Sequence, residues 1–297
     1  MPAIFHQPIS RTDFLKISTG FLGALVVRPQ PARANQDSTA AYQIALLSDT
    51  HIPSDATETY RGFAPVQNLK QVIPQVTERK PAATIINGDA ARLMGNLEDY
   101  QMLKGLLEPL AQQSPVYIGL GNHDDRDNFS KIFSGKDDTN RQSVNGKNVL
   151  VVEHPTVRTI VLDSLLYVDK TAGLLGKTQR RWLAKYLTDA DNRPTVLFVH
   201  HSLGDGDGEL LDVDRLFRII EPHKNVKAVF YGHSHRYKID RRGDLFLVNL
   251  PAVGYPFGAS EPVGWIDAIF DTNGVDLTLH AVGGNLEKNG QTTRLDW

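Results

Sequence analysis

The stretch Val116-Tyr117-Ile118-Gly119-Leu120-Gly121-Asn122-His123-Asp124 gives the clearest indication of the fold. Its first half is a short apolar run of the kind that forms a buried strand, and the run ends in a turn. The turn places an amide, an imidazole and a carboxylate in three consecutive positions, which a purely structural turn rarely needs. We interpret the stretch as a strand that carries metal-binding and proton-transferring groups to the edge of a sheet.

Short apolar runs of this kind recur through the body of the chain and alternate with helical periodicity, which indicates an α/β fold. The expected strands span residues 42–47, 83–86, 116–120, 149–152, 159–162, 195–199, 228–231, 245–248, 265–270 and 276–281. Strands without helices dominate residues 245–281, so we expect an antiparallel portion. The sequence therefore predicts a four-layer α/β/β/α sandwich, with two mixed sheets flanked by helices.

Apolar side chains spaced by three and four residues predict three helices. The first carries the buried stripe Leu97, Tyr100, Leu103, Leu107 and Leu110. The second begins at a Thr178 cap, ends before Pro194, and turns inward Trp182, Leu183, Tyr186 and Leu187. The third is closed by Pro222 and buries Val213, Leu216, Phe217 and Ile220.

The composition is that of an ordinary soluble globular protein. The chain has 297 residues and a formal charge of −2, from 32 Lys+Arg against 34 Asp+Glu, which argues against a binder of nucleic acid or of anionic membranes. It contains no cysteine, so any metal must be bound by His, Asp, Glu or Asn. We predict one catalytic domain at residues 41–285 and a polar C-terminal tail at residues 286–297.

The first residues predict a targeting segment rather than part of the fold. Arg11 and Lys16 precede an apolar run at residues 17–27, and Ala32-Arg33-Ala34 has the pattern of a cleavage site. The run is shorter than the about 20 residues that span a bilayer. The segment resembles a twin-arginine export signal but has Thr12 in place of the second arginine. We predict an export signal at residues 1–34, the alternative being an amphipathic helix packed on a cytoplasmic domain.

The metal-capable side chains fall just past the carboxyl ends of five predicted strands, the edge where open α/β sheets bind ligands. They are Asp49 and His51, Asp89, Asn122 and His123, His200 and His201, and His233 and His235. Each segment alone has an ordinary reading, such as a capping aspartate or a solvent-facing histidine pair. The loop at residues 204–208 invites a calcium interpretation, but Leu210 stands where such a loop needs glycine. We expect that loop to be flexible and to lie at the mouth of the site.

Taken in order, these segments resemble the signature of the calcineurin-like metallophosphoesterases over residues 44–251. Gly88-Asp89, the helix with Tyr100, the run from Gly121 to Arg126 and Leu162-Asp163-Ser164 look most like the class III cyclic nucleotide phosphodiesterase branch. The chain departs from that branch after the paired histidines, where Ser202 replaces a common proline.

The resemblance implies a dinuclear centre whose two metals, drawn from Fe, Mn or Zn, activate a bridging hydroxide. One metal would take Asp49, His51 and His235, the other Asn122, His200 and His233, and Asp89 would bridge them. His123 would donate a hydrogen bond to the leaving oxygen or protonate it, and Asp124 would hold the other nitrogen of its ring or tune its charge. His201 would either contact substrate or pack beside His200, and Arg126 would line the pocket and contact substrate.

These expectations favour a phosphodiesterase acting on small phosphodiesters such as cyclic nucleotides. A phosphomonoesterase of the same fold is the first alternative, and a metal-free binding scaffold is the second. We expect a small phosphoester as the partner, no nucleic-acid polymer and no stable membrane span. A homodimer is left open. Export would place the protein in the periplasm or outside the cell, where external phosphoesters are better candidate substrates than a cytoplasmic second messenger.

Overall fold

The computed structural model describes residues 41–133 and 139–297, and the predicted export segment lies outside them. Its helices and strands are β1 (Tyr42–Leu47), α2 (Pro65–Arg79), β2 (Ala83–Asn87), α3 (Leu97–Ala111), β3 (Val116–Gly119), α4 (Arg126–Phe133), β4 (Arg141–Gln142), β5 (Val149–Glu153), β6 (Arg158–Val161), α5 (Gly176–Asp189), β7 (Thr195–Phe198), α6 (Val213–Ile220), β8 (Val226–Tyr231), β9 (Lys238–Arg242), β10 (Leu245–Asn249), β11 (Pro262–Asp271), β12 (Gly274–Gly284) and β13 (Thr292–Asp296).

The strands form two mixed sheets. The first has six strands in the order β13-β12-β11-β1-β2-β3, in which β1, β2 and β3 are parallel and the C-terminal strands are antiparallel. The second has seven strands in the order β4-β5-β6-β7-β8-β10-β9, with β6, β7, β8 and β10 parallel. The predicted antiparallel portion at residues 245–281 is therefore confirmed for β11 and β12.

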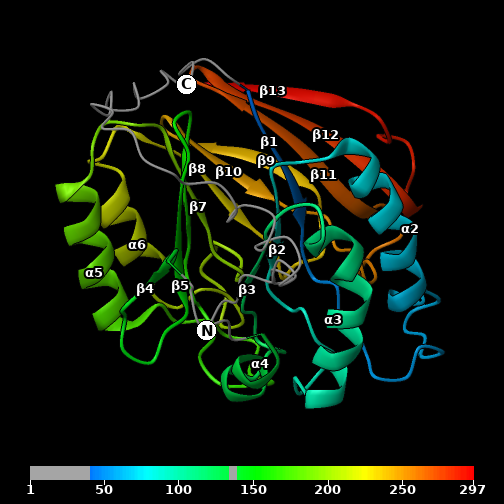
Figure 1. Ribbon diagram of the computed structural model, residues 1–297. Helices are drawn as coiled ribbons and strands as arrows, with labels where there is room; N and C mark the ends of the chain where they lie inside the picture. Colours follow the sequence, from blue (N-terminus) through cyan, green and yellow to red (C-terminus); the bar gives the residue numbers. More distant parts are fainter. Residues whose placement is uncertain (1–40, 134–138) are drawn as a thin grey trace, which may run out of the picture.

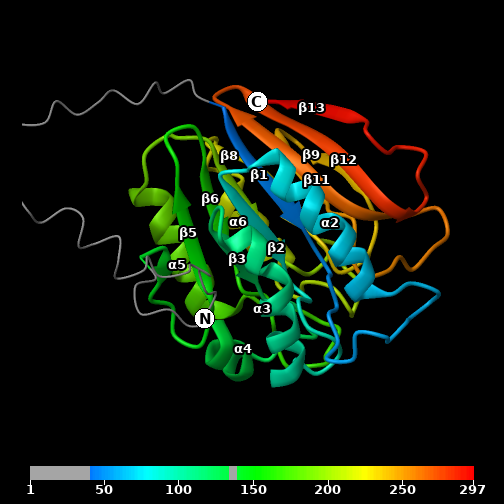
Figure 2. The same ribbon diagram turned by 45° about the vertical axis from the view of Figure 1, so that its right-hand side comes forward.

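Helices cover the outer faces of both sheets. Figures 1 and 2 show α2 and α3 on the side of the first sheet and α5 and α6 on the side of the second. Three apolar clusters fill the spaces between these layers. The predicted four-layer α/β/β/α sandwich is confirmed.

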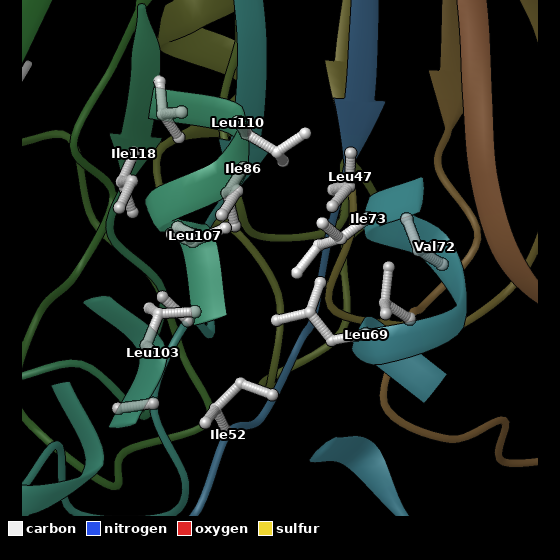
Figure 3. Close-up of a cluster of buried hydrophobic side chains, with 14 of the residues drawn as sticks. Leu47, Ile52, Leu69, Val72, Ile73, Ile86, Leu103, Leu107, Leu110 and Ile118 are labelled. Carbon is white, nitrogen blue, oxygen red and sulfur yellow. The ribbon is translucent and has the colours of Figure 1, made fainter. Parts of the chain in front are cut away.

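Strand β1 shows why its sequence has no polar face. Ala45 and Leu47 pack toward α2 and α3, whereas Ile44 and Leu46 pack into the cluster between the sheets. Because side chains alternate along a strand, a strand buried on both faces reads as an unbroken apolar run. Figure 3 shows the helix-facing cluster, in which Leu69 of α2 and Leu107 of α3 point toward the sheet.

Local signals explain the start of α3. Asn96 and Asp99 form a capping box, in which each side chain accepts a hydrogen bond from the backbone of the other. Such boxes satisfy the amide groups that the first helical turn leaves unpaired. The second predicted helix begins earlier than expected, because α5 starts at Gly176 and Thr178 lies inside it.

Two expectations for the C-terminal third differ from the structure. Residues 286–297 are not only a polar tail, because β13 pairs with β12 and buries Leu295. Threonine hydroxyls of Thr278 and Thr292 lie 2.7 Å apart across this pair. Edge strands with one solvent-facing side lack the apolar run on which the sequence argument relies, which also explains why β9 is not predicted. Across residues 41–133 and 139–297, the helices are too short or too polar to cross a membrane.

Candidate metal centre

Five loops at the carboxyl ends of strands meet at one place, and they come from both sheets. The loops after β1, β2 and β3 belong to the first sheet, and those after β7 and β8 to the second. The loops after β1 and β2 run side by side, with backbone bonds from Asp49 N to Gly88 O (3.1 Å) and from His51 N to Asp89 O (2.9 Å). The site therefore bridges the two sheets.

Five residues predicted as metal ligands have a left-handed backbone. Positive φ angles occur at Asp49 (51°), His51 (46°), Asp89 (45°), His233 (69°) and His235 (50°). Such conformations cost about 1–3 kcal/mol each in non-glycine residues and concentrate at functional sites. Backbone strain at these five positions lowers the stability of the fold, and the strained loops hold the ligand atoms in a fixed arrangement.

Two glycines allow the loops to approach one another. Gly88 has φ +85°, and a Cβ atom there would lie 2.5 Å from Nδ1 of His200. A Cβ atom on Gly121 would collide with the carboxylate of Asp89. A side chain at either position would therefore displace a metal-capable group.

Three sets of side chains place one ligand atom each within 4.8 Å of the others. The first is Asp49, His51 and His235, and the second is Asp89, His200 and His233. The third set joins His51 and Asp89 to His123. The first two correspond to the two sites inferred from the resemblance, and Asp89 belongs to both the second and the third.

Backbone carbonyls fix which ring nitrogen of each histidine is free. Nδ1 of His200 donates to Asn87 O (2.9 Å), and Nδ1 of His235 donates to Tyr255 O (2.5 Å), so Nε2 of each is the nitrogen left for a metal. His233 has the opposite arrangement, because its Nε2 donates to Gly208 O at 3.0 Å. Such outer hydrogen bonds orient the imidazoles of metal sites.

The carboxylates are held in the same way. Backbone N–H of His123 donates to Asp89 Oδ1 (2.9 Å), and backbone N–H of His233 donates to Asp49 Oδ1 (3.1 Å). Ser48 Oγ donates to Asp49 Oδ2 at 2.5 Å. The two backbone donors belong to His123 and His233, whose side chains also lie at the centre. The backbone of these residues therefore positions the two carboxylates.

Orphaned polar atoms indicate that the residues fit metal ions. Among the described residues, Oδ1 of Asn122 and Nε2 of His200 are buried without a hydrogen-bond partner. A buried polar atom without a partner costs about 1–3 kcal/mol. A cation would satisfy both atoms, and imidazole, carboxylate and amide ligands suit first-row transition metals.

The electrostatic balance keeps the carboxylates charged. Burial alone would raise the pKa of Asp49, but His235 and His200 outweigh it and hold the pKa at about 2. Burial, together with the charge on His200, lowers the pKa of His233 to about 4. Burial also lowers the pKa of His51 well below its ordinary value. His51 and His233 are therefore neutral and ready to donate lone pairs.

His200 is the exception. Burial would lower its pKa, but the carboxylates of Asp89 and Asp49 outweigh burial and raise the pKa to about 10. Its Nε2 lies 3.3 Å from Asp89 Oδ2. A metal that binds His200 must therefore displace this proton, and metal binding releases protons in general.

His123 borders the centre and is partly open to solvent, with 19% of its side chain exposed. Its Nδ1 donates to Leu93 O at 2.8 Å, and Asp169 Oδ1 lies 3.7 Å from the same nitrogen. The ring centroid lies 5.3 Å from that of His51. With Nδ1 committed to the carbonyl, Nε2 is the nitrogen left for other contacts.

Asp124 does not hold the other ring nitrogen of His123, so this part of the prediction is wrong. Its carboxylate accepts four hydrogen bonds, from Ala90 N, Ala91 N, Gly121 N and the Tyr100 hydroxyl, at distances from 2.8 to 3.2 Å. Burial, with the nearby charge of Asp89, raises the pKa of Asp124 to about 6. Asp124 ties the loop after β3 to the loop after β2 and to α3.

The two predicted substrate-binding residues have internal partners. His201 is buried and its Nδ1 lies 2.7 Å from Ser164 Oγ, while its ring packs 5.1 Å from that of His200. Packing beside His200 is one of the two alternatives that the sequence predicts for His201. The guanidinium of Arg126 donates to Asp163 at 2.8 and 2.7 Å and to the carbonyl of Leu165, which gives the side chain a structural role, and its contact with substrate stays a prediction.

Two residues that orient the ligands do not follow from the sequence. Tyr255 accepts from His235 through its carbonyl, and its ring centroid lies 4.8 Å from those of His51 and His235. Gly208 accepts from His233, which places the loop at residues 204–208 against the centre. Backbone carbonyls carry no sequence signal, so neither contact could be predicted from residue types.

The family model for the calcineurin-like phosphoesterases matches residues 42–237. A probable cyclic nucleotide phosphodiesterase of Synechococcus sp. is 29% identical over 75% of this chain and 85% of its own length. The glycerophosphodiester phosphodiesterase GpdQ of Enterobacter lignolyticus is 27% identical over 70% of this chain and 76% of its own length.

Solved structures are similar in fold. A dimetal phosphatase from Danio rerio has a TM-score of 0.62 at 12% identity, covering 84% of this chain and 99% of its own. A purple acid phosphatase from yellow lupin has a TM-score of 0.63 at 16% identity, covering 86% of this chain and 53% of its own. Both share the arrangement of two sheets between helices.

Proposed function

The chain belongs to the calcineurin-like phosphoesterase family, and from that premise we propose that it is a metal-dependent phosphodiesterase acting on small phosphodiesters, cyclic nucleotides among them. One observation carries the proposal. Two sets of imidazole and carboxylate ligand atoms lie next to each other, and His123 borders them through Asp89 and His51. This arrangement offers two cation sites and one neighbouring proton donor.

We assign Asp49, His51 and His235 to one metal and Asn122, His200 and His233 to the other, with Asp89 shared. Two bound cations would supply charge stabilisation for the phosphoryl oxygens and a hydroxide nucleophile at neutral pH. The protein's own part is to hold these ligands at fixed positions through the strained backbone and the carbonyl contacts. Fe, Mn and Zn all suit the ligand set, and we propose one of these three.

His123 acts on the leaving group in this proposal. Its Nδ1 contacts Leu93 O, which leaves Nε2 toward the substrate, and in the imidazolium form Nε2–H would give its proton to the alcohol or phenol oxygen as the bond to phosphorus breaks, leaving the neutral ring. General acid catalysis of this kind contributes about 10² to 10⁴ in rate. A phosphodiester always releases an alcohol, so a proton donor beside the metals suits this substrate class.

Relatives support a diester rather than a monoester. The two curated relatives described above are named as phosphodiesterases, and each matches at least 70% of this chain. We also propose that residues 1–34 direct export, which would give the enzyme external substrates. N-terminal sequencing of natively expressed protein tests this point, since an intact Met1 would contradict cleavage.

The deciding experiment compares substrates after metal reconstitution. An aryl phosphodiester, the matched aryl monoester and a cyclic nucleotide are assayed with the wild type and with Asp89→Asn as the blank. We expect the wild type to cleave the diesters faster than the monoester. The activity of Asp89→Asn should fall by more than about 100-fold, because changes at residues that only contact metal ligands already cost about 10- to 100-fold. Faster cleavage of the monoester by the wild type would overturn the diesterase assignment.

A further inference from the structure

Most of the exposed large apolar side chains lie in loops that follow strands, as the metal-capable residues do. In the part of the chain that the structure describes, eight large apolar side chains are exposed. Six of them lie in loops that follow β1, β2, β6, β7 and β10, namely Tyr60, Leu93, Met94, Tyr167, Leu211 and Phe257. Four of these loops carry a metal-capable residue or an orienting carbonyl. Exposed apolar groups concentrated at one edge indicate a binding surface.

Two of the six are aromatic rings next to the candidate metal ligands, one by direct stacking and the other through Tyr255. The ring of Phe257 is 49% exposed, lies 4.1 Å from that of His235 and is inclined to it by 12°. The ring of Tyr60 is 38% exposed and lies 4.6 Å from that of Tyr255. Tyr255 in turn contacts His51 and His235. A planar group on Tyr60 or Phe257 would therefore lie beside the first of the two metal sites.

A tight turn adds a cation between these rings. Tyr60 and Phe63 exchange backbone hydrogen bonds of 2.8 and 2.9 Å, and Arg61 and Gly62 between them have φ angles of 54° and 82°. A two-residue turn with both central residues left-handed is rigidly defined. It places the guanidinium of Arg61 at 5.6 Å from the Tyr60 centroid and 5.2 Å from the Phe257 centroid.

Arg61 differs from its neighbour Arg92. Arg92 lies 4.7 Å from the Tyr60 centroid and is paired with Glu58 at 2.9 Å. Among residues 41–133 and 139–297, Arg61 has no ion-pair partner, and its guanidinium lies over the rings of Tyr60 and Phe257. A planar, uncompensated cation over two exposed rings can stack on, or donate hydrogen bonds to, a planar ligand.

We propose that Tyr60, Arg61 and Phe257, here called the aromatic rim, bind the nucleobase of a nucleoside phosphodiester. The inference rests on the proposed phosphodiesterase function and names the part of the substrate that gives specificity. Nucleobases stack on aromatic side chains and on guanidinium planes, and they carry acceptors for the N–H groups of arginine.

The charges of the rim argue against the other common diester groups. A choline or ethanolamine group would also be attracted by aromatic faces, but Arg61 and Arg92 already occupy the cation positions over them. A second cation would be repelled. A glycerol group is small and polar and gains little from rings of this size. The rim therefore favours a neutral, planar base.

The test uses matched substrates that differ only in the base. The methyl phosphodiester of adenosine and the same ester of ribose are assayed with metal-loaded enzyme, and glycerophosphocholine is the cationic comparison. We expect Phe257→Ala to lower kcat/KM for the adenosine ester about tenfold or more and to change it less than about twofold for the ribose ester. Phe257→Trp should restore the preference, and Arg61→Ala should reduce the discrimination against glycerophosphocholine.

Binding gives an independent readout. Calorimetric titration with adenosine monophosphate and ribose 5-phosphate should show tighter binding of the nucleotide, and Phe257→Ala should remove that difference. Ile269→Ala changes an exposed apolar side chain of β11 outside the loops of the centre and serves as the control.

The outcomes separate the two proposals. If the wild type cleaves both methyl esters and Phe257→Ala weakens both equally, the aromatic rim is not a base subsite, although the phosphodiesterase assignment stands. A wild-type preference for glycerophosphocholine would also overturn the rim. If the wild type cleaves no diester but does cleave an aryl monoester, the proposed function fails, and the rim assignment fails with it.

Discussion

His123 and Asp124 are adjacent in the chain, but their side chains lie in different surroundings. His123 is partly exposed and faces the centre, whereas Asp124 is fully buried and binds backbone amides of two loops. The pair thus separates chemistry from support. A change at His123 should therefore lower mainly turnover, whereas a change at Asp124 should lower mainly stability.

For His123→Gln we expect metal content to stay at the wild-type level and kcat to fall about 10²- to 10⁴-fold on esters of aliphatic alcohols. The loss should be much smaller on nitrophenyl esters, because a good leaving group needs no proton. Metal analysis and a series of leaving groups measure the two effects. An equal loss across the series, or a loss of metal, would contradict the role as proton donor.

For Asp124→Ala we expect destabilisation of at least about 3 kcal/mol, because several buried donors lose a charged acceptor. Thermal unfolding of the metal-free protein measures it, with an expected fall in Tm of about 6 to 12 °C. His123→Ala is the matched control and should change stability by less than about 1 kcal/mol. Equal stability of the two variants would show that the loop contacts of Asp124 contribute little.

The candidate ligands could be predicted because each follows a strand whose apolar run is visible in the sequence. Their orienting partners could not, because the contacts join residues far apart and use backbone atoms. His200, for example, donates to the carbonyl of Asn87, 113 positions earlier. The motif predicts that Arg126 contacts substrate, but in the structure its guanidinium donates two hydrogen bonds to Asp163. Residue type predicts what a side chain can bind and leaves open which of several partners is nearest.

At the scale of elements, the ion pair of Arg126 fastens the start of α4 to the end of β6. Asp163 is buried and also accepts from the backbone of Asn148 and Leu165, while Lys147 Nζ lies 3.8 Å away. These contacts join the start of α4, the segment with Lys147 and Asn148, and the end of β6. Its contribution should appear in stability and not in substrate binding.

For Arg126→Ala we therefore expect a loss of about 3 kcal/mol in the free energy of unfolding with KM unchanged, because a buried carboxylate loses its main partner. Denaturant unfolding and steady-state kinetics measure the two quantities. Asp163→Asn and the double variant complete a cycle, in which a coupling of at least about 1 kcal/mol is expected. A large rise in KM with unchanged stability would instead support the predicted contact of Arg126 with substrate.

The elements that the sequence predicts are those buried on both faces or on a regular stripe, such as β1 and α3. Short or half-exposed elements are not predicted. In β9 the burial pattern is mostly exposed, and its sequence is dominated by charged residues. Helix α2 carries Pro74 in its interior, which opposes a helical reading of an otherwise periodic segment. Tertiary packing against the sheet outweighs that local preference.

At the scale of the whole molecule, the centre joins two sheets that otherwise meet through an apolar cluster. The shared carboxylate Asp89 follows β2 of the first sheet, whereas His200 and His233 follow β7 and β8 of the second. A cation bound by the three would therefore connect the sheets at their carboxyl edge. Its removal would leave buried carboxylates and imidazoles balanced only by one another.

We accordingly expect chelation to lower the Tm and reconstitution to restore it. Metal at about 100 times its dissociation constant stabilises a folded protein by about 2.7 kcal/mol, which corresponds to about 5 to 11 °C here. The Tm should rise with the logarithm of metal concentration in the wild type. In Asp89→Asn the slope should be much smaller, because the ligand common to two of the sets is lost. A wild-type Tm that does not respond to metal would mean that the folded protein does not bind the ions in preference to the unfolded chain, and the assigned metal sites would then be wrong.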